Sequence, residues 1–432
     1  MTSHVHIVNK DNLAVHKTVT APAPTSPLAP GHVRVKPEVL GITLNNRSYA
    51  LLGDLLAWWS AYPVPPEAAP APAGDGAPET RWGIVPAWGY GRVLESNGVQ
   101  GISAGDMLQG FWPTSSRPVD LRLEPHGAAA GGEGFDETSA HRAKLMTIYN
   151  RYVVTGEARA AERSVEDLAW ESNCAVVWGA GWIFTEYVFA PAPREPVTPL
   201  GDTSVPWTRE DADVGSAVVV NLAASSKTAM AISFGFRRRN GDQSPPLAVL
   251  DVTSSPGRYP KAQLGGTAAH RVVSYEDLSS AETLAWIGGL KASRVVLIDS
   301  GAPPGTAQTF HDALFASSSS NDAATTTTLP QSLYYIPVGA GPTELSAPDA
   351  ARAKRFQFNT SPVIDVAEAR DGVAAVRAGR HRSFVDARAA GMFDGLELVV
   401  GQGVAGEGGI EGAWGRIVGG TFPRDKALAF KL

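Results

Sequence analysis

The 432-residue sequence has little of what a disulfide or a zinc site requires. It contains one cysteine, Cys174, and nine histidines that are scattered along the chain without an H-x-x-x-H motif. One cysteine excludes an internal disulfide, and zinc sites are built from cysteine, histidine and carboxylate ligands at regular spacing. The sequence therefore predicts a protein that binds no metal ion of this kind.

Long apolar runs and long basic runs are also missing. No window approaches the about 20 consecutive apolar residues that a membrane-spanning helix requires, and the residues after Met1 lack the apolar core of a signal peptide. The charge is −6, from 37 Lys+Arg against 43 Asp+Glu, and the main basic run is Arg237-Arg238-Arg239. These features predict a soluble, cytoplasmic protein with no nucleic-acid or membrane partner.

Glycine is missing where a nucleotide-binding turn usually carries it. Residues 215–236 read GSAVVVNLAASSKTAMAISFGF, which indicates a buried strand, a short polar turn and a helix. A dinucleotide fingerprint, G-x-G-x-x-G, needs glycines in this turn, and none is present. A P-loop would have glycines at Asn221 and Ser226, so only Lys227 and Thr228 match that motif.

Polar side chains occupy this turn instead. In a strand-turn-helix unit the turn lies at the carboxyl edge of the sheet, where the N–H groups of the helix attract phosphate. Ser225, Ser226 and Thr228 supply hydroxyl donors there, and Lys227 supplies a positive charge. We expect these four residues to bind phosphate. The alternatives are that Ser225 only caps the helix and that Lys227 is a solvated first-turn lysine.

Strands and helices alternate on both sides of this turn. The expected strands are residues 217–220, 247–252, 270–274, 294–299 and 333–338, and helical segments at 227–236 and 279–290 separate some of them. This alternation predicts a parallel, doubly wound sheet. Glycines within the expected helix 165–189 indicate close helix packing, residues 317–328 predict an exposed loop, and further helices are expected at 348–356 and 363–369.

The end of the second strand bears on the choice of cofactor. An acidic residue there normally binds the ribose hydroxyls of NAD, whereas small or basic residues accept the extra phosphate of NADP. Asp251 leaves an NAD role open, but the residues after it favour NADP, and Lys227 could meet either the pyrophosphate or the 2′-phosphate. The further cofactor contacts expected after the second and fourth strands are Thr253, Ser254, Ser255, Arg258, Ser300 and Gly301.

The first third of the chain is rich in short β-like segments and glycine. Residues 32–43 alternate as a half-buried strand does, and Pro37 within them indicates a bulge or a sheet edge. Residues 4–8 predict an edge strand, and 48–59 and 140–149 predict helices. The apolar runs at 91–95 and 107–111 predict successive strands of a small barrel.

Three segments, VRVKPEVLGITLNNR, PAWGYGRVLES and GVQGISAGDML, together resemble the GroES-like barrel of the medium-chain dehydrogenase/reductase superfamily. The resemblance rests on Gly89, Gly91, Val93, Gly98, Val99, Gly105 and Asp106, and it extends to the final KALAFKL. Trp88 and Tyr90 replace the usual His-Glu pair, which removes a zinc ligand. SSKTA in place of the glycine turn is similar to an uncharacterised, DUF2855-like branch of the zinc-free, quinone oxidoreductase-like members.

This resemblance implies an α/β protein with a GroES-like β-barrel and a Rossmann-type doubly wound sheet. The barrel is expected in residues 1–164, the nucleotide domain in 165–345, and the completion of the barrel in 346–432. The implied activity is the zinc-independent, NADPH-dependent reduction of a small hydrophobic carbonyl compound or enone. Because nucleotide domains of the superfamily often pair, a homodimer is also expected.

The resemblance also points to candidate catalytic residues. Tyr49 is the first candidate proton donor, with Asn46 beside it, and Tyr90 is the second. The alternative role for both tyrosines is aromatic packing. Because a fold does not fix a function, a non-redox enzyme, such as a lyase or hydrolase of a carbonyl compound, or a binding protein stays an alternative.

Overall fold

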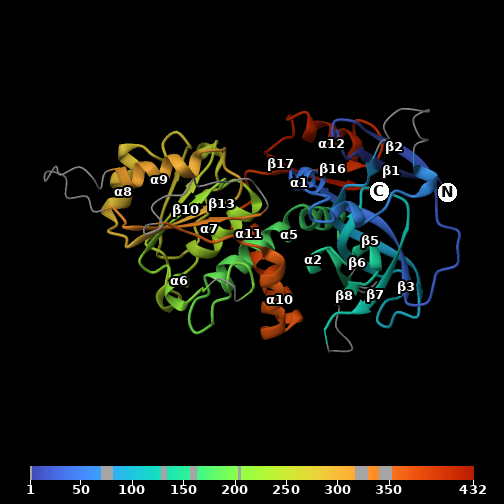
Figure 1. Cartoon of the computed structure of the whole chain (residues 1–432), viewed down its shortest axis with the longest axis horizontal. Coiled ribbons are helices and arrows are strands. Elements are labelled where there is room, and N and C mark those ends of the chain that lie inside the picture. Colours follow the sequence, from blue (N-terminus) through green and yellow to red (C-terminus); the bar gives the residue numbers. More distant parts are fainter. Residues whose placement is uncertain are drawn as a thin grey trace. The chain divides into compact units, whose positions relative to one another are not determined.

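The computed structural model describes residues 2–69, 81–127, 134–155, 163–202, 206–316, 329–339 and 353–432. These residues form two compact units (Figure 1). Unit 1 comprises Met1–Val176 and Leu396–Leu432, and unit 2 comprises Val177–Gly395. The expected loop at 317–328 lies outside the described residues.

Unit 1 contains a closed β-barrel. Six antiparallel strands form the ring, in which each strand pairs with the next and the last pairs with the first: β3 (His32–Ile42), β5 (Pro86–Asn97), β6 (Met107–Pro113), β9 (Arg151–Thr155), β8 (Gly134–Glu137) and β7 (Val119–Pro125). The C-terminal strands β17 (Lys426–Lys431) and β16 (Glu397–Gln402) extend this sheet from β3. The helix α12 (Ile410–Val418) connects these two strands.

A second, smaller sheet also belongs to unit 1. It has the order β2-β1-β4, formed by His16–Pro22, Thr2–Asn9 and Trp82–Gly83. The prediction of an edge strand at residues 4–8 was therefore wrong, because β1 pairs on both sides. Short alternation alone does not show how many neighbours a strand has.

The bulge predicted at Pro37 is confirmed. The register between β3 and β5 shifts between Pro37 and Val39. On its other side, β3 pairs with β7 through His32 to Val35 and with β17 through Val39 to Ile42. Proline has no N–H to donate, so Pro37 fits the gap between these two partners.

Two helix predictions in unit 1 were only partly right. The segment 48–59 overlaps the end of α1 (Asn45–Leu51) and the start of a separate 3₁₀ turn, Trp58–Ser60. The segment 140–149 has only a 3₁₀ turn, Ala140–Arg142, and the four-residue α2 (Thr147–Asn150). Here tertiary contacts override the helical pattern, because the buried Arg142 side chain donates to the backbone oxygens of Ala61 and Tyr149.

Unit 2 is built on a parallel sheet of six strands. Their order is β12-β11-β10-β13-β14-β15, formed by Ala269–Val273, Ala248–Val252, Ala217–Leu222, Arg294–Asp299, Ser332–Pro337 and Ala353–Arg355. All five predicted strands are present. The sixth, β15, lies where a helix was expected at 348–356, of which 353–356 is described. The chain runs from β10 outward to β12 and then crosses to β13, so the direction of winding reverses beside β10.

Helices cover this sheet on both faces (Figure 1). The helices α8 (Ala281–Gly289) and α9 (Thr306–Ala316) pack on the face that carries Val218, Val220 and Leu250. The helix α7 (Lys227–Arg237) packs on the opposite face of β10 and β11. The arrangement is the predicted doubly wound sheet.

The segment expected to be a long helix is helical throughout but changes its winding. It consists of α4 (Val165–Trp170), a π-helical turn (Glu171–Ala175), α5 (Val176–Ile183) and a second π-helical turn (Phe184–Val188). A Cβ atom on Gly181 would lie 2.5 Å from the Cβ of Ala231. Gly181 therefore allows close packing against α7, and Gly179 leaves room for the side chain of Arg380, so both glycines serve packing, as the sequence indicated.

The chain returns to the barrel later than the expected residue 346. The helices α10 (Thr360–Asp371) and α11 (Val373–Ala389) belong to unit 2, as does the short α6 (Arg209–Ala212), and the chain re-enters unit 1 at Leu396. One reason is that α10 packs against α11 and the second π-helical turn of unit 2. Among the described residues, no helix combines the length and apolarity needed to cross a bilayer.

We predict that Gly41→Ala destabilises unit 1 by about 1–3 kcal/mol. A Cβ atom on Gly41 would lie 2.3 Å from the backbone oxygen of Ser172. The next residue, Asn173, holds β3 and β17 together by donating to Ile42 O at 3.1 Å and Leu428 O at 2.7 Å. Chemical denaturation measures the effect. The control is Gly408→Ala, because a Cβ there has no neighbour within 4 Å, and equal midpoints for the two variants would contradict the prediction.

Candidate functional site

The turn after β10 is shaped without glycine. Ala223 adopts a left-handed conformation with φ of +54°, and its N–H donates to the hydroxyl of Tyr275 at 3.2 Å. Ser226 caps α7, because its Oγ accepts from the N–H of Ala229 at 3.3 Å. The helix therefore begins at Lys227, and its first N–H groups lie at the carboxyl end of β10.

The four predicted phosphate ligands in this turn differ in what they already contact. Ser225 is exposed, with Oγ 2.6 Å from the Oγ1 of Thr253. Thr228 is half-buried and donates its hydroxyl to the backbone oxygen of Val177 at 3.0 Å. Lys227 is half-buried, and no carboxylate in the described part of unit 2 forms an ion pair with it. Ser225 and Lys227 therefore have the side chains best placed for an outside ligand.

Asp251, at the end of the second strand, is committed to the interior. Its Oδ1 accepts from the Nδ2 of Asn221 at 2.7 Å. Its Oδ2 accepts from the Oγ of Ser233 at 2.6 Å and lies 2.8 Å from the Nε2 of His270. The carboxylate is fully buried, so these partners occupy the group that would otherwise bind a ribose.

The residues after β11 and β13 complete one edge of the sheet. Ser254, Ser255 and Arg258 are exposed, whereas Thr253 is buried. After β13, the Oδ1 of Asp299 accepts from the N–H of Gly301 at 2.9 Å. Because β11, β10 and β13 are adjacent and parallel, the structure brings all ten predicted cofactor contacts to the same edge of the sheet, at the reversal beside β10.

In unit 1, Tyr49 lies in a cluster of aromatic rings. Its ring centroid is 4.8 Å from that of Trp58 and 5.1 Å from that of Phe111. Trp88 Nε1 donates to the Tyr49 hydroxyl oxygen at 3.1 Å, and the Tyr149 hydroxyl is hydrogen-bonded to it as well. Burial raises the pKa of Tyr49 to about 12, so the phenol keeps its proton at neutral pH.

Asn46 holds the turn between β3 and α1. Its Oδ1 accepts from the N–H of Thr43 at 2.8 Å, and its Nδ2 donates to the backbone oxygen of Pro86 at 2.8 Å. Both ends of the amide are thus bound to backbone, and the side chain is buried. Asn46 positions the segment that carries Tyr49.

Tyr90 takes part in a different buried contact. Its hydroxyl donates to Oε2 of Glu171, and Arg163 forms an ion pair with the same carboxylate. The guanidinium of Arg163 also lies 5.0 Å from the centroid of the Tyr90 ring. Burial, reinforced by the neighbouring carboxylate, raises the pKa of Tyr90 above its ordinary value.

Several residues at these sites were not found from the sequence. Asn221, Ser233 and His270 surround Asp251 from three separate elements, and no motif links them. Tyr149 was expected within a helix and lies in α2, but its place beside Tyr49 and Trp88, 5.7 Å from the latter between ring centroids, was not foreseen. The abundance of tyrosine and tryptophan in this region was the one available signal.

Comparison with known proteins places the chain in a family. Residues 40–423 match a family described as a protein of unknown function, DUF2855. The chain belongs to the DUF2855 family. A search of curated proteins finds no match to this DUF2855 protein.

Solved structures share the fold of this DUF2855 protein at low sequence identity. A mutant enoyl thioester reductase from Candida tropicalis matches with a TM-score of 0.52 and 11% identity over 100% of both chains. The complex of Etr1p with NADP and crotonyl-CoA matches with 0.52 and 10% over 100% of both chains. CurA from Vibrio vulnificus, in complex with NADPH, matches with 0.50 and 10% over 99% of this chain and 98% of CurA. The predicted combination of a GroES-like barrel and a Rossmann-type sheet is confirmed.

We predict that Tyr90→Phe lowers the free energy of unfolding by about 1–3 kcal/mol, because Glu171 loses a buried hydrogen-bond donor. Denaturant unfolding of Tyr90→Phe, Glu171→Gln and the double variant measures the coupling. The double variant should lose less than the sum of the single variants. Additive losses would show that the contact carries no net stability.

Proposed function

We propose that this DUF2855 protein is an NADPH-dependent reductase that uses no zinc and acts on a small hydrophobic carbonyl compound or enone. The observation that carries the proposal is the gathering of Ser225 to Thr228, Thr253 to Arg258, and Ser300 with Gly301 at one edge of the sheet in unit 2. Dinucleotides bind at this edge in doubly wound folds, where the winding reverses. When bound, NADPH supplies a hydride.

The residues at this edge fit a phosphate-rich cofactor. The N-terminus of α7 favours an anion, and Lys227 adds a charge that no described carboxylate of unit 2 neutralises. The buried partners of Asp251 remove the acidic group that selects NAD. The exposed Ser254, Ser255 and Arg258 supply hydroxyl and cationic groups for a 2′-phosphate. This combination favours NADP over NAD.

Tyr49 is the proton donor that we propose. Trp88 can only donate to its oxygen, and we propose that Tyr149 donates to the same oxygen, which leaves the proton of Tyr49 for a substrate oxygen. Tyr90 is the weaker candidate, since its hydroxyl already donates to Glu171. Asn46 is proposed as a positioning residue through its two backbone contacts.

The surroundings of Tyr49 support the proposed substrate class. Trp58, Phe111 and Tyr149 form an aromatic environment that suits an apolar molecule. Neighbouring structures include one with crotonyl-CoA, an α,β-unsaturated thioester, which supports an enone or a related enoyl compound. We also propose, on the basis of the sequence, that the protein is a cytoplasmic homodimer.

We predict that Lys227→Ala weakens NADPH binding roughly ten- to a hundredfold. The loss of a charge-assisted hydrogen bond costs about 1.5–3 kcal/mol, and about 1.4 kcal/mol corresponds to a factor of ten. Fluorescence titration of NADPH and NADH against wild-type protein and the variant measures it. Loss for NADPH alone assigns Lys227 to the 2′-phosphate, and loss for both assigns it to the pyrophosphate.

The matched control is Lys291→Ala, since Lys291 is an exposed lysine of unit 2 that follows α8. Its affinity for both cofactors should equal that of the wild-type protein. Unchanged affinity in Lys227→Ala would contradict the phosphate site. It would leave the turn as a plain helix cap and favour a non-redox activity.

We predict that Tyr49→Phe lowers kcat for enone reduction roughly 10²- to 10⁴-fold, the usual contribution of a general acid. The Kd for NADPH should not change. Oxidation of NADPH with crotonyl-CoA and a panel of short enones and quinones provides the assay. Tyr90→Phe is the control, because it should retain kcat. If Tyr49→Phe retained activity and Tyr90→Phe lost it, Tyr90 rather than Tyr49 would be the proton donor.

A further inference from the structure

A cavity of about 310 Å³ opens on unit 1, and neither Tyr49, Asn46 nor Tyr90 lines it. Its volume is at the lower end of the range for small-molecule sites. We propose that this cavity binds a small organic carboxylate with an apolar body. The site is independent of the proposed reductase activity, because all its lining residues belong to unit 1 and none was assigned to the cofactor or to the proton transfer.

One side of the cavity is apolar. Its lining includes Val5, Pro63, Pro65, Ile84 and Leu121. Prolines and branched side chains are stiff, so this surface loses little conformational entropy when it takes up a ligand. Burial of an apolar body against it is favourable by roughly 25 cal/mol for each Å² removed from water.

The cavity is lined by two arginines, Arg117 and Arg142, and by two carboxylates, Asp120 and Glu137, so its formal charges balance, but the two carboxylates each have an arginine partner. Asp120 is paired with Arg34, which lies outside the lining, with 2.7 Å between Oδ1 and Nε. Glu137 is paired with Arg142, with 3.5 Å between Oε2 and Nε. Arg117 has no carboxylate partner among the described residues. Of its side-chain nitrogens, Nε donates to the backbone oxygen of Pro22 at 2.9 Å. The terminal nitrogens of Arg117 are left for an anion.

His141 does not change this balance. It also lines the cavity, and partial burial lowers its pKa from the ordinary value of 6.5. The ring is therefore neutral at pH 7. One uncompensated guanidinium group, from Arg117, matches a ligand of single negative charge better than a phosphate of higher charge.

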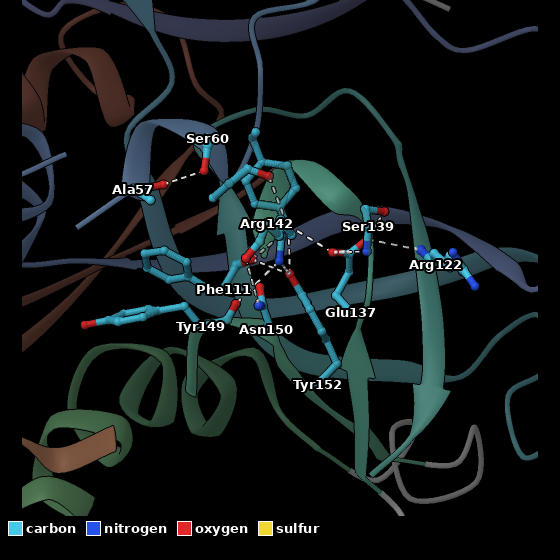
Figure 2. A network of polar contacts seen from close by, with 12 residues as sticks. Ala57, Ser60, Phe111, Arg122, Glu137, Ser139, Arg142, Tyr149, Asn150 and Tyr152 are labelled. Carbon is cyan, nitrogen blue, oxygen red and sulfur yellow. Dashed lines mark hydrogen bonds and ion pairs between the residues drawn. The ribbon is translucent and has the colours of Figure 1, made fainter. Parts of the chain in front are cut away.

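Arg142 supplies a second donor (Figure 2). Its side chain is 1% exposed, and it lies at the centre of a network with Glu137, Tyr152 and Phe111. Nε donates to Ala61 O at 3.0 Å, and Nη1 donates to Tyr152 Oη at 3.0 Å. Nη2 is buried and has no hydrogen-bond partner in the part of the chain that the structure describes. A buried guanidinium nitrogen without an acceptor is costly, and a carboxylate oxygen that came within reach would satisfy it.

The second guanidinium links the cavity to the aromatic cluster around Tyr49. Nη1 of Arg142 also donates to the backbone oxygen of Tyr149 at 3.4 Å, and the Tyr149 ring centroid lies 5.9 Å from that of Tyr49. The ligand would therefore contact a side chain that holds the backbone of this cluster. Because Nη2 is buried, a ligand in the cavity reaches it only when the Arg142 side chain or its neighbours move.

Calorimetric titration of the full-length protein tests the proposal with three probes: hexanoate, hexanamide and inorganic phosphate. Hexanoate should bind, and hexanamide, which has the same shape without the charge, should bind roughly ten- to a hundredfold more weakly, as expected for one charge-assisted hydrogen bond. Phosphate should bind more weakly than hexanoate, since it gains nothing from the apolar side. The variant Arg117→Gln should lose hexanoate affinity by the same roughly ten- to a hundredfold factor.

Arg122→Gln is the matched control. Arg122 lies on β7 near the cavity, but it is an exposed residue whose Nη2 pairs with Oε1 of Glu124 at 3.2 Å. This variant should bind hexanoate within about a factor of two of wild type. Each variant is half-buried or exposed at the changed residue, so each should remain folded, which thermal unfolding checks.

Three results would overturn the assignment. The first is no binding of hexanoate at about 10 mM, a concentration above the Kd of even a weak specific site. The second is equal affinity for hexanoate and hexanamide, or equal affinity in Arg117→Gln and wild type. The third is phosphate binding as tight as that of hexanoate, which would indicate a plain anion site without an apolar requirement.

Discussion

Unit 1 depends on β3, because this strand closes the barrel and also pairs with the C-terminal strand. A ring of strands requires β3 to pair with β5 on one side and with the last strand of the ring, β7, on the other. The same side of β3 also accepts the C-terminal strand β17. β7 pairs with His32 to Val35 and β17 with Val39 to Ile42, and Pro37, which lies between these two stretches, has no N–H to leave unpaired. Asn46 and Tyr49 follow β3 directly, so a strand from the end of the chain helps to fix the proposed proton donor.

Buried polar groups set the chemistry available in each unit. A buried carboxylate is tolerated when hydrogen bonds or an opposite charge compensate its loss of water. In unit 2 three side chains compensate Asp251, which removes it from the surface that a cofactor would reach. In unit 1 the hydroxyl of Tyr90 donates to Glu171, which is also paired with Arg163, so this hydroxyl is occupied inside the protein as well. Polar groups that are hydrogen-bonded inside the protein are not available to a ligand, so only the remaining polar groups are candidates for ligand contacts.

The sequence was sufficient for features that depend on local physics. Apolar β-branched runs identified all five expected strands of unit 2, and the position of Pro37 identified the bulge in β3. It was insufficient where distant residues decide the structure. The interval 140–149 has a helical pattern, but the buried Arg142 bonds to Ala61, far away in sequence, and the helix breaks. Likewise, Tyr149 meets Tyr49 only through the closed barrel. Periodicity carries no information on such contacts.

The turn after β10 shows why a missing fingerprint need not mean a missing site. Glycine serves there by adopting unusual backbone angles and by leaving room for a ligand. Ala223 takes the left-handed conformation at a cost of about 1–2 kcal/mol, and the Tyr275 hydroxyl satisfies its N–H. Ser225 keeps its hydroxyl at the surface beside Thr253. The shape of the turn is thus retained by tertiary contacts, and the donors that we propose for it are side-chain hydroxyls rather than backbone alone. A search for glycines would not detect the proposed site, whereas the order of the strands draws attention to this turn.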